Sequence, residues 1–191
     1  MQIKKDDVNM RILASAEEEF FEKGYSASSM RRIAGAAGMT PGNLYSYYSG
    51  KEDLLSAVLS GPLETIRDYI ETIRRDTVMD EGALAEITGS IIDLYLNFRR
   101  PFMILMFGVR GTVFEGFRDR VTKAVAERLR RDYFAQSKRD FDPFLPSAAA
   151  EALISGLLEI FSRYPDDEAK LRDTVGEFLS MMFSDTYYKK D

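Results

Sequence analysis

The first part of the chain carries hydrophobic residues at the spacing of short amphipathic helices. Ile12, Ala16 and Phe20 lie four residues apart, which places them on one face of a helix over residues 8–23. Gly24 ends that helix, because glycine is a poor helix former that tolerates turn conformations. We expect this helix to support the shorter elements that follow it.

Two short helices with a tight turn between them are predicted next. Over residues 29–37 apolar side chains recur at i, i+3, i+4 and i+7, starting from Met30, with a serine at the start that can cap the helix. Gly38 suits the turn, and Thr40 can cap a new helix that has Pro41 at its first position. The predicted order is therefore helix, glycine turn, helix.

The second short helix has one apolar side and one polar side. Leu44 shares the apolar side with Tyr48, which we therefore expect to be a core residue. The opposite side consists of small or hydrogen-bonding residues without a carboxylate, namely Gly42, Asn43, Tyr45 and Ser46. This side can approach a polyanion closely.

Charge sets the same segment apart from the rest of the chain. Residues 23–51 contain four cations, Lys23, Arg31, Arg32 and Lys51, and no acidic residue, although the whole protein has a formal net charge of −5. An acid-free basic stretch in an acidic protein indicates a nucleic-acid-binding surface. We interpret Arg32 as an ordinary surface cation within it.

The order and spacing of these motifs are specific. They comprise Gly24-Tyr25, Ser28-Ser29-Met30-Arg31, Ile33-Ala34, Ala37-Gly38, Gly42-Asn43-Leu44-Tyr45, Tyr47-Tyr48 and Lys51-Glu52-Asp53-Leu54-Leu55. Over roughly residues 8–55 the chain thereby resembles the N-terminal domain of the tetracycline-repressor (TetR) family of transcriptional regulators. The resemblance implies an all-α protein of about nine helices. It would have a helix-turn-helix DNA-binding domain at residues 1–52 and a helical effector-binding and dimerisation domain at residues 53–191.

DNA contacts are expected from both short helices. A recognition helix places its N-terminal residues against base edges in the major groove, where amides pair with adenine and guanidinium groups with guanine. Base contacts are expected from Arg31, Thr40, Asn43 and Tyr45. Phosphate contacts are expected from Ser28, Ser29, Tyr47 and Lys51. The resemblance adds the backbone around Pro41 and Gly42.

The rest of the chain predicts more helices and no strand. Apolar periodicity indicates helices at about residues 51–74, 81–99 and 114–137, a short one restarting at Pro101, a loop at 138–146, and two final helices. Gly61-Pro62 interrupts the first of these, so we expect a kink or two helices that meet there. We interpret it as a tolerated kink rather than a hinge.

The last two predicted helices have wide apolar faces that suit self-association. Small residues allow close helix approach, and two such helix pairs can form a four-helix interface. The resemblance implies a dimer contact in the same place. The candidates are Ala149, Ala152, Leu153, Gly156, Leu157, Ile160, Phe178, Leu179 and Met182. We therefore expect a homodimer on a palindromic operator.

Large, adaptable apolar residues are concentrated in the middle of the chain. They are Tyr95, Phe98, Phe102, Met103, Met106, Phe107, Phe117 and Val121. Such residues either line a pocket for a flat or apolar ligand or fill a core. The resemblance favours a pocket, because it implies a small effector held inside the helical body. The adjacent Arg99 and Arg100 are interpreted as solvated.

Composition excludes several classes of chemistry. The chain contains no histidine and no cysteine, which removes serine–histidine and cysteine–histidine catalysis and thiolate metal sites. We expect no metal and no cofactor. The first residues lack the apolar core of a signal peptide, and the longest apolar run, residues 101–109, is too short to span a bilayer. A cytoplasmic protein is expected.

Two other functions remain open on the residues alone. One is a helical enzyme that uses carboxylates such as Asp93 or Glu115 in the apolar body, and the other is an adaptor that binds proteins through the last two helices. Salt-dependent binding to duplex DNA would separate both from a regulator. The favoured interpretation is a non-enzymatic, ligand-responsive transcriptional regulator, and the resemblance makes a repressor the commoner outcome.

Overall fold

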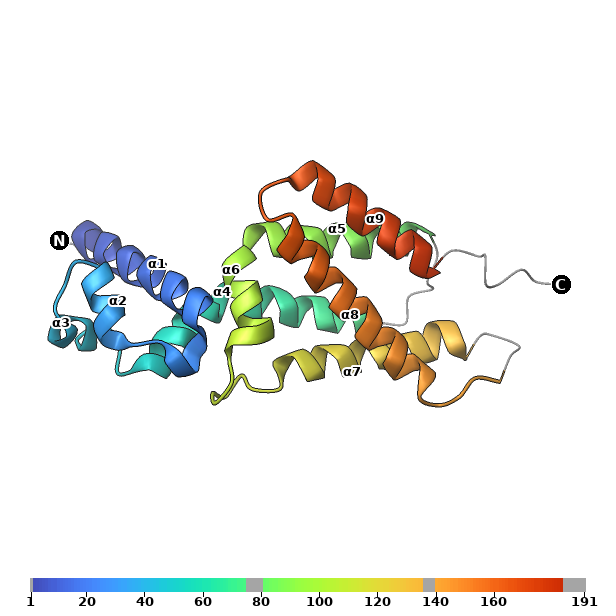
Figure 1. The fold of residues 1–191 in the computed structure, drawn as a ribbon, viewed down its shortest axis with the longest axis horizontal. Coiled ribbons are helices and arrows are strands. Elements are labelled where there is room, and N and C mark those ends of the chain that lie inside the picture. Colours follow the sequence, from blue (N-terminus) through green and yellow to red (C-terminus); the bar gives the residue numbers. More distant parts are fainter. Residues whose placement is uncertain (1, 75–80, 136–139, 184–191) are drawn as a thin grey trace. The chain divides into compact units, whose positions relative to one another are not determined.

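The structure is a computed structural model that describes residues 2–74, 81–135 and 140–183. It contains the α-helices α1 (Gln2–Ala27), α2 (Met30–Ala36), α3 (Pro41–Tyr45), α4 (Lys51–Arg74), α5 (Glu81–Asn97), α6 (Arg99–Met103), α7 (Phe117–Leu129), α8 (Leu145–Arg163) and α9 (Glu168–Phe183). The π-helical segments η1 (Ile104–Gly108) and η2 (Arg130–Phe134) continue α6 and α7 (Figure 1). No strand occurs in these ranges, so the predicted all-α fold is confirmed.

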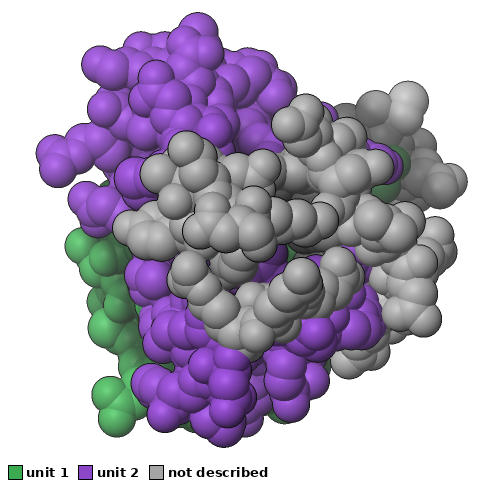
Figure 2. Space-filling view, turned by 90° about the vertical axis from the view of Figure 1, so that its right-hand side faces the viewer, with its two compact units in different colours: residues 1–67, 98–118 green, residues 68–97, 119–191 purple. Residues whose placement is uncertain are grey.

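Two compact units make up the chain (Figure 2). Unit 1 comprises residues 1–67 and 98–118, and unit 2 comprises residues 68–97 and 119–191. The domain boundary predicted after residue 52 falls inside unit 1, because residues 51–67 of α4 and the segment 98–118 belong to the same compact unit as the N-terminal helices.

The core of the N-terminal helices follows the predicted periodicity. Ile12, Ala16 and Phe20 of α1 are fully buried, as are Ile33 of α2 and Leu44 of α3. Burying side chains of this size contributes about 1.5–3 kcal/mol each for the larger ones, and it holds together helices that are too short to be stable alone. Gly24, with φ 67° and ψ 165°, interrupts α1 where its end was predicted.

Segment 98–118 is attached to α1 and α4 by polar contacts as well as by packing. Arg100 forms an ion pair with Glu18, and the Ser26 hydroxyl donates to the Arg110 carbonyl at 3.2 Å. The Val113 N–H donates to Glu52 Oε1 at 3.0 Å. These bonds join residues more than 60 positions apart, which explains why residues 98–118 belong to unit 1.

α4 passes through Gly61-Pro62 as one helix. The expectation that two helices would meet there is therefore wrong. A Cβ at Gly61 would lie 2.7 Å from Cε1 of Phe98, so the position is occupied by glycine because an aromatic ring packs directly on the backbone. The periodicity of the sequence cannot predict this contact, because Phe98 is distant from Gly61 in the chain.

Unit 2 packs α5, α8 and α9 through aromatic and polar contacts. The Tyr95 ring stacks on Phe161 with centroids 4.2 Å apart, and its hydroxyl donates to the Phe161 carbonyl at 2.7 Å. Arg172 of α9 pairs with Asp93 of α5 at 2.9 Å.

The start of α7 differs from the periodicity. The helix expected at 114–137 begins at Phe117, after Gly116 with a φ of 74°, and becomes π-helical at Arg130. Its expected end near Ser137 and the start of the following loop at Lys138 lie outside the described residues.

Candidate nucleic-acid interface

The turn between α2 and α3 has the geometry that its residues predicted. Gly38 has a φ of 71°, a conformation that favours glycine. Thr40 is the N-cap of α3, where its Oγ1 accepts from the Asn43 N–H at 3.3 Å and Pro41 follows at the first helical position. The predicted helix, glycine turn and second helix are confirmed.

α3 is anchored from beneath by two buried residues. Leu44 is fully buried, and Tyr48, just after the helix, is 9% exposed. The Tyr48 hydroxyl donates to Oδ1 of Asn9 on α1 at 2.7 Å, and burial raises the pKa of Tyr48. Tyr48 is therefore a core residue, as predicted, and its contact with α1 fixes how far α3 projects from the body of unit 1.

The outward side of α3 is polar and free of carboxylates. Gly42, Asn43 and Tyr45 are exposed, with Tyr45 at 53%, and Thr40 and Pro41 are exposed beside them. Tyr47 is half-buried, and Arg31 on α2 is exposed. These residues can therefore meet a ligand without rearrangement of the core. Their contact with DNA remains a prediction.

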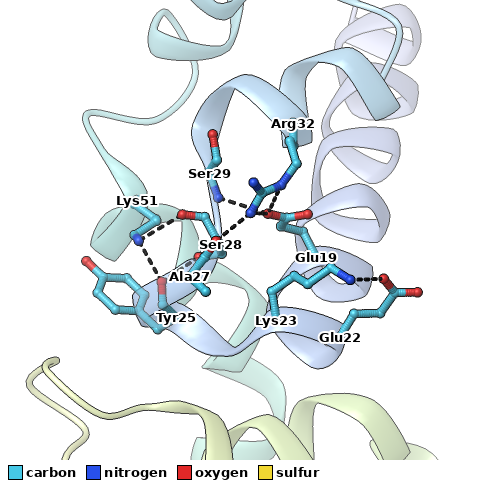
Figure 3. A network of polar contacts seen from close by, with 9 residues as sticks. All are labelled: Glu19, Glu22, Lys23, Tyr25, Ala27, Ser28, Ser29, Arg32 and Lys51. Atoms are coloured by element: carbon cyan, nitrogen blue, oxygen red, sulfur yellow. Dashed lines mark hydrogen bonds and ion pairs between the residues drawn. The ribbon is translucent and has the colours of Figure 1, made fainter.

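Lys51 at the start of α4 is directed into the protein. Its ammonium donates to the Tyr25 carbonyl at 2.6 Å and to the Ser28 carbonyl at 3.0 Å, and it lies 4.3 Å from the centre of the Tyr25 ring (Figure 3). Desolvation lowers the pKa of Lys51. An ammonium has three N–H donors, and two of those of Lys51 already bond to carbonyls of unit 1. One donor is left for a phosphate.

The two serines that precede α2 are placed differently from each other. Ser28 is 8% exposed, and its hydroxyl donates to the Tyr25 carbonyl at 2.7 Å. Ser29 is the N-cap of α2, but its side chain makes no capping hydrogen bond, so the expected serine oxygen cap is wrong. In Figure 3 the Ser29 hydroxyl points away from the polar network, which leaves it available to a phosphate.

The cations of residues 23–51 are mostly engaged within the protein. Arg32, a surface cation whose side chain is 54% exposed, donates through Nε to Glu19 Oε1 at 2.7 Å, and its Nη2 also forms an ion pair with that carboxylate. Lys23 lies 3.4 Å from Glu22. Among the described residues, Arg31 is the one cation of the four that makes no such contact.

Glu19 was not identified as a partner of the basic segment when only residues 23–51 were considered. Its carboxylate lies just outside the acid-free window, on the preceding helix, and its side chain is only 12% exposed. Desolvation raises the pKa of Glu19, but hydrogen bonds from Arg32 and from the Ser29 N–H outweigh it and lower the pKa below the ordinary 4.5. No signal in the linear sequence identifies this partner, because it depends on how α1 crosses α2.

The predicted interface residues on α8 and α9 divide by burial. Leu153, Leu157 and Leu179 are buried within the chain, whereas Ala152 is exposed. The remaining candidates, Ala149, Gly156, Ile160, Phe178 and Met182, are partly exposed. The Phe178 ring fills the space where a Cβ at Gly156 would lie, so this glycine serves packing between α8 and α9 of one chain. Their contact with a second copy remains a prediction.

α8 is unusually apolar for a helix with an exposed face. By length and composition alone it would suffice to cross a membrane, a criterion that core helices of soluble proteins also meet, and a third of its apolar stretch is buried in the chain. The exposed positions of the helix are mostly polar, such as Ser147, Glu151 and Glu159, and its exposed apolar residues are Leu145 and Ala152.

The predicted effector residues are divided between the two units. Tyr95 and Val121 belong to unit 2, whereas unit 1 contains Phe98, Phe102, Met103, Met106, Phe107 and Phe117. Phe102, Met106 and Phe117 are buried, Phe107 is 57% exposed, and Tyr95 is fully engaged with Phe161. Ligand contact at these residues remains a prediction. Within the described residues no three acidic side chains gather into a metal site.

Comparison with known proteins gives the context for this arrangement. Residues 12–58 match the family described as "Bacterial regulatory proteins, tetR family". The chain is 27% identical over 168 residues to the HTH-type transcriptional regulator UidR of Escherichia coli K12, which covers 82% of this chain and 81% of UidR. It is 34% identical over 88 residues to the fatty acid metabolism regulator protein of Bacillus subtilis, 46% of this chain and 43% of that protein.

Solved structures share the fold. The structure of AibR in complex with isovaleryl coenzyme A and operator DNA has a TM-score of 0.66 and 20% sequence identity, and the match covers 92% of this chain and 98% of AibR. The curated relatives above are transcriptional regulators and not enzymes, in agreement with the prediction from composition.

Proposed function

The chain belongs to the TetR family of transcriptional regulators, and from this premise we propose that it is a ligand-responsive repressor that binds a palindromic operator as a homodimer. The observation that carries the proposal is the exposed, carboxylate-free side of α3, held above a buried Leu44 and capped by Thr40. Within this five-residue helix only Leu44 is buried, so the residues on its outer face do not contribute to the core. The absence of acids there suits a surface that meets phosphates.

Base reading is assigned to three residues around α3. Asn43 can pair with adenine through its amide, and Arg31, unpaired among the described residues, can pair with guanine through its guanidinium. Tyr45, 53% exposed, can contact a base edge or a thymine methyl group. Ser29 and Tyr47 are assigned to phosphates, with the third donor of Lys51 in support.

Dimerisation through α8 and α9 supplies the second reading head. One small head buries too little surface for selective binding, since single modules cover about 600–1,000 Å². The partly exposed residues Ala149, Gly156 and Ile160 of α8 and the exposed side chains of Ala152 and Met181, the latter 63% exposed, support this face as the contact. A two-fold interface uses the same surface on both copies and presents two heads to two half-sites.

The effector is proposed to be a small molecule with an apolar group, and acyl-coenzyme A thioesters are the first class to test. The Bacillus relative is a fatty acid metabolism regulator, and AibR binds isovaleryl coenzyme A. Effector and operator would oppose each other, so each would weaken binding of the other by the same factor. Such a regulator acts in the cytoplasm.

One experiment tests the whole proposal. The full-length protein selects duplexes from a random DNA pool, and the selection is repeated with acyl-coenzyme A of short and long chain length and with free coenzyme A as the control. The expected result is a palindrome whose binding falls steeply with salt and is reversed by an acyl thioester but not by the free carrier. Recovery of no preferred sequence would overturn the DNA-binding assignment, and a monomeric mass in light scattering would overturn the dimer.

A further inference from the structure

The N-terminus of α2 lacks the capping that its sequence pattern would normally provide. The helix has seven residues, far fewer than the roughly 12–15 that an isolated helix needs, so its position depends on its neighbours. The N-cap Ser29 makes no side-chain bond, and the third helical position is Arg32. Arginine has no acceptor atom, so it cannot close a capping box by accepting the N-cap N–H.

Glu19 of α1 supplies the missing acceptor. Its Oε1 accepts from the Ser29 N–H at 2.9 Å and from Arg32 Nε at 2.7 Å, so one carboxylate holds both the N-cap N–H of α2 and the residue three positions further on (Figure 3). A carboxylate beside a helix N-terminus also interacts favourably with the helix dipole. The arrangement replaces an intrahelical cap by a cap from another helix.

The opposite end of α2 is also met by a charge from α1. Arg11 Nη1 donates to the Ala37 carbonyl at a long 3.5 Å, and it is the weaker of the two contacts. Arg11 and Glu19 are eight residues apart, or about 12 Å along a helix, and the seven residues of α2 span about 10.5 Å. The two charges therefore bracket α2 with the signs that its dipole favours.

We propose that Glu19 is a positioning residue for operator reading, which acts by setting the place of α2 and, through it, of α3. The proposal rests on the proposed function as a DNA-binding regulator. α2 carries Arg31 and packs directly against α3, so a shift of its N-terminus displaces the base-reading groups together. Arg32 then serves as the counter-ion of Glu19 and not as a contact to phosphate.

The decisive comparison is Glu19→Ala against Glu22→Ala. Both substitutions remove one negative charge from α1 and replace it by a strong helix former. If only charge mattered, each would leave DNA binding unchanged or tighter. Positioning by Glu19 instead predicts a roughly three- to thirtyfold loss of operator affinity, the range that corresponds to loss of a helix cap, and no loss for Glu22→Ala.

Binding to a non-operator duplex separates positioning from unfolding. A variant that is partly unfolded loses operator and non-operator binding in the same proportion. A displaced α2 lowers operator binding while phosphate-driven binding to any duplex persists, so the ratio of the two affinities falls. We expect this ratio to fall for Glu19→Ala alone.

A second substitution should restore operator binding although it makes the protein more negative. Arg32→Glu introduced into Glu19→Ala places a carboxylate at the third position of α2, where it can accept the Ser29 N–H as in a capping box. The double variant is two charges more negative than Glu19→Ala, so repulsion alone would weaken binding further. Positioning predicts that the operator ratio recovers toward the wild-type value.

The outcomes are separable. A Glu19→Ala protein whose operator ratio equals or exceeds that of the wild type, or a double variant that falls below Glu19→Ala, overturns the role of Glu19 while wild-type operator binding stands. Failure of the wild-type protein to prefer any duplex overturns the proposed function itself, and this inference with it.

Discussion

The outer side of α3 and residues 24–29, which form the last turn of α1 after the kink at Gly24 and the link to α2 (called the turn below), look alike in sequence but are used in opposite ways. Both are short, polar and free of carboxylates, and both contain an aromatic residue and serines or amides. On α3 these groups face outward, with Tyr45 53% exposed. At the turn, the carbonyls of Tyr25 and Ser28 accept from Lys51, and the Ser29 N–H is taken by Glu19.

The difference teaches that an acid-free basic segment is not the same as a free basic surface. Three of its four cations have partners inside the protein, and one of those partners, Glu19, comes from the preceding helix. Fewer than the four cations counted in residues 23–51 are therefore free to contact DNA. The turn supports α2 and α3 but is not itself part of the DNA-reading surface. Four substitutions or conditions test this division, beginning with the largest effect.

Removing the two base-reading groups should abolish recognition without loss of stability. Arg31→Ala with Asn43→Ala is expected to lower operator affinity by about 2–6 kcal/mol, since each bidentate base contact contributes about 1–3 kcal/mol. Both residues are exposed, so the free energy of unfolding should stay within about 0.5 kcal/mol of the wild type. Fluorescence anisotropy and urea denaturation measure the two quantities. Undiminished affinity and sequence choice would contradict the assignment of α3.

Removing Lys51 should have the opposite effect, lowering the free energy of unfolding more than operator affinity. Lys51→Ala removes the ammonium donor of the Ser28 carbonyl and one of the donors of the Tyr25 carbonyl, which keeps the Ser28 hydroxyl, and we expect unfolding to become easier by about 1–3 kcal/mol. Lys23→Ala is the matched control, because that exposed pair with Glu22 contributes only about 0–1 kcal/mol. If the two variants unfold at the same urea concentration, Lys51 is not a structural clamp.

The two N-cap residues offer a smaller and more selective test. Thr40→Ala removes a hydroxyl that accepts the Asn43 N–H and should destabilise the protein by about 0.5–2 kcal/mol. Ser29→Ala removes a hydroxyl that makes no cap and should change stability by less than about 0.5 kcal/mol. Equal destabilisation by both substitutions, measured by thermal unfolding, would show that the Ser29 hydroxyl does cap α2.

Acid should weaken the turn more than α3, and this is the smallest effect. The pKa of Glu19 is lowered in the folded protein, so the stability that its carboxylate contributes is present above the ordinary value of 4.5 and is lost as pH falls below it. The stability difference between wild type and Glu19→Ala should therefore shrink from pH 6 toward pH 3. The same difference for Glu22→Ala serves as the reference. A gap that widens in acid would reverse the assigned sign.

Most of the helices and their buried faces follow from local sequence. Ile12, Phe20 and Leu44 are buried because their spacing places them on one side of a helix, and Thr40 and Pro41 start α3 through their own chemistry. Tyr48 was predicted as core from the same periodicity. The candidate reading surface follows directly, because whatever lies opposite a buried residue on a five-residue helix must face outward.

Contacts between segments distant in the chain could not be predicted from the sequence. The Phe98 ring requires glycine at position 61, and the pattern there reads only as a helix breaker. The boundary of unit 1 depends on hydrogen bonds such as those from Val113 to Glu52 and from Ser26 to Arg110, which have no local signature. The same holds for Tyr95, whose stacking partner Phe161 is 66 residues away.

By itself the sequence determined the all-α fold and the helix-turn-helix, because helix period, caps and turn glycines act over a few residues. Tertiary structure alone decided which charges are free, since the direction of Lys51 and the pairing of Arg32 with Glu19 depend on how three helices cross. Local rules fix where each helix begins and ends, whereas the partner of a side chain is fixed by segments that the local rules do not place.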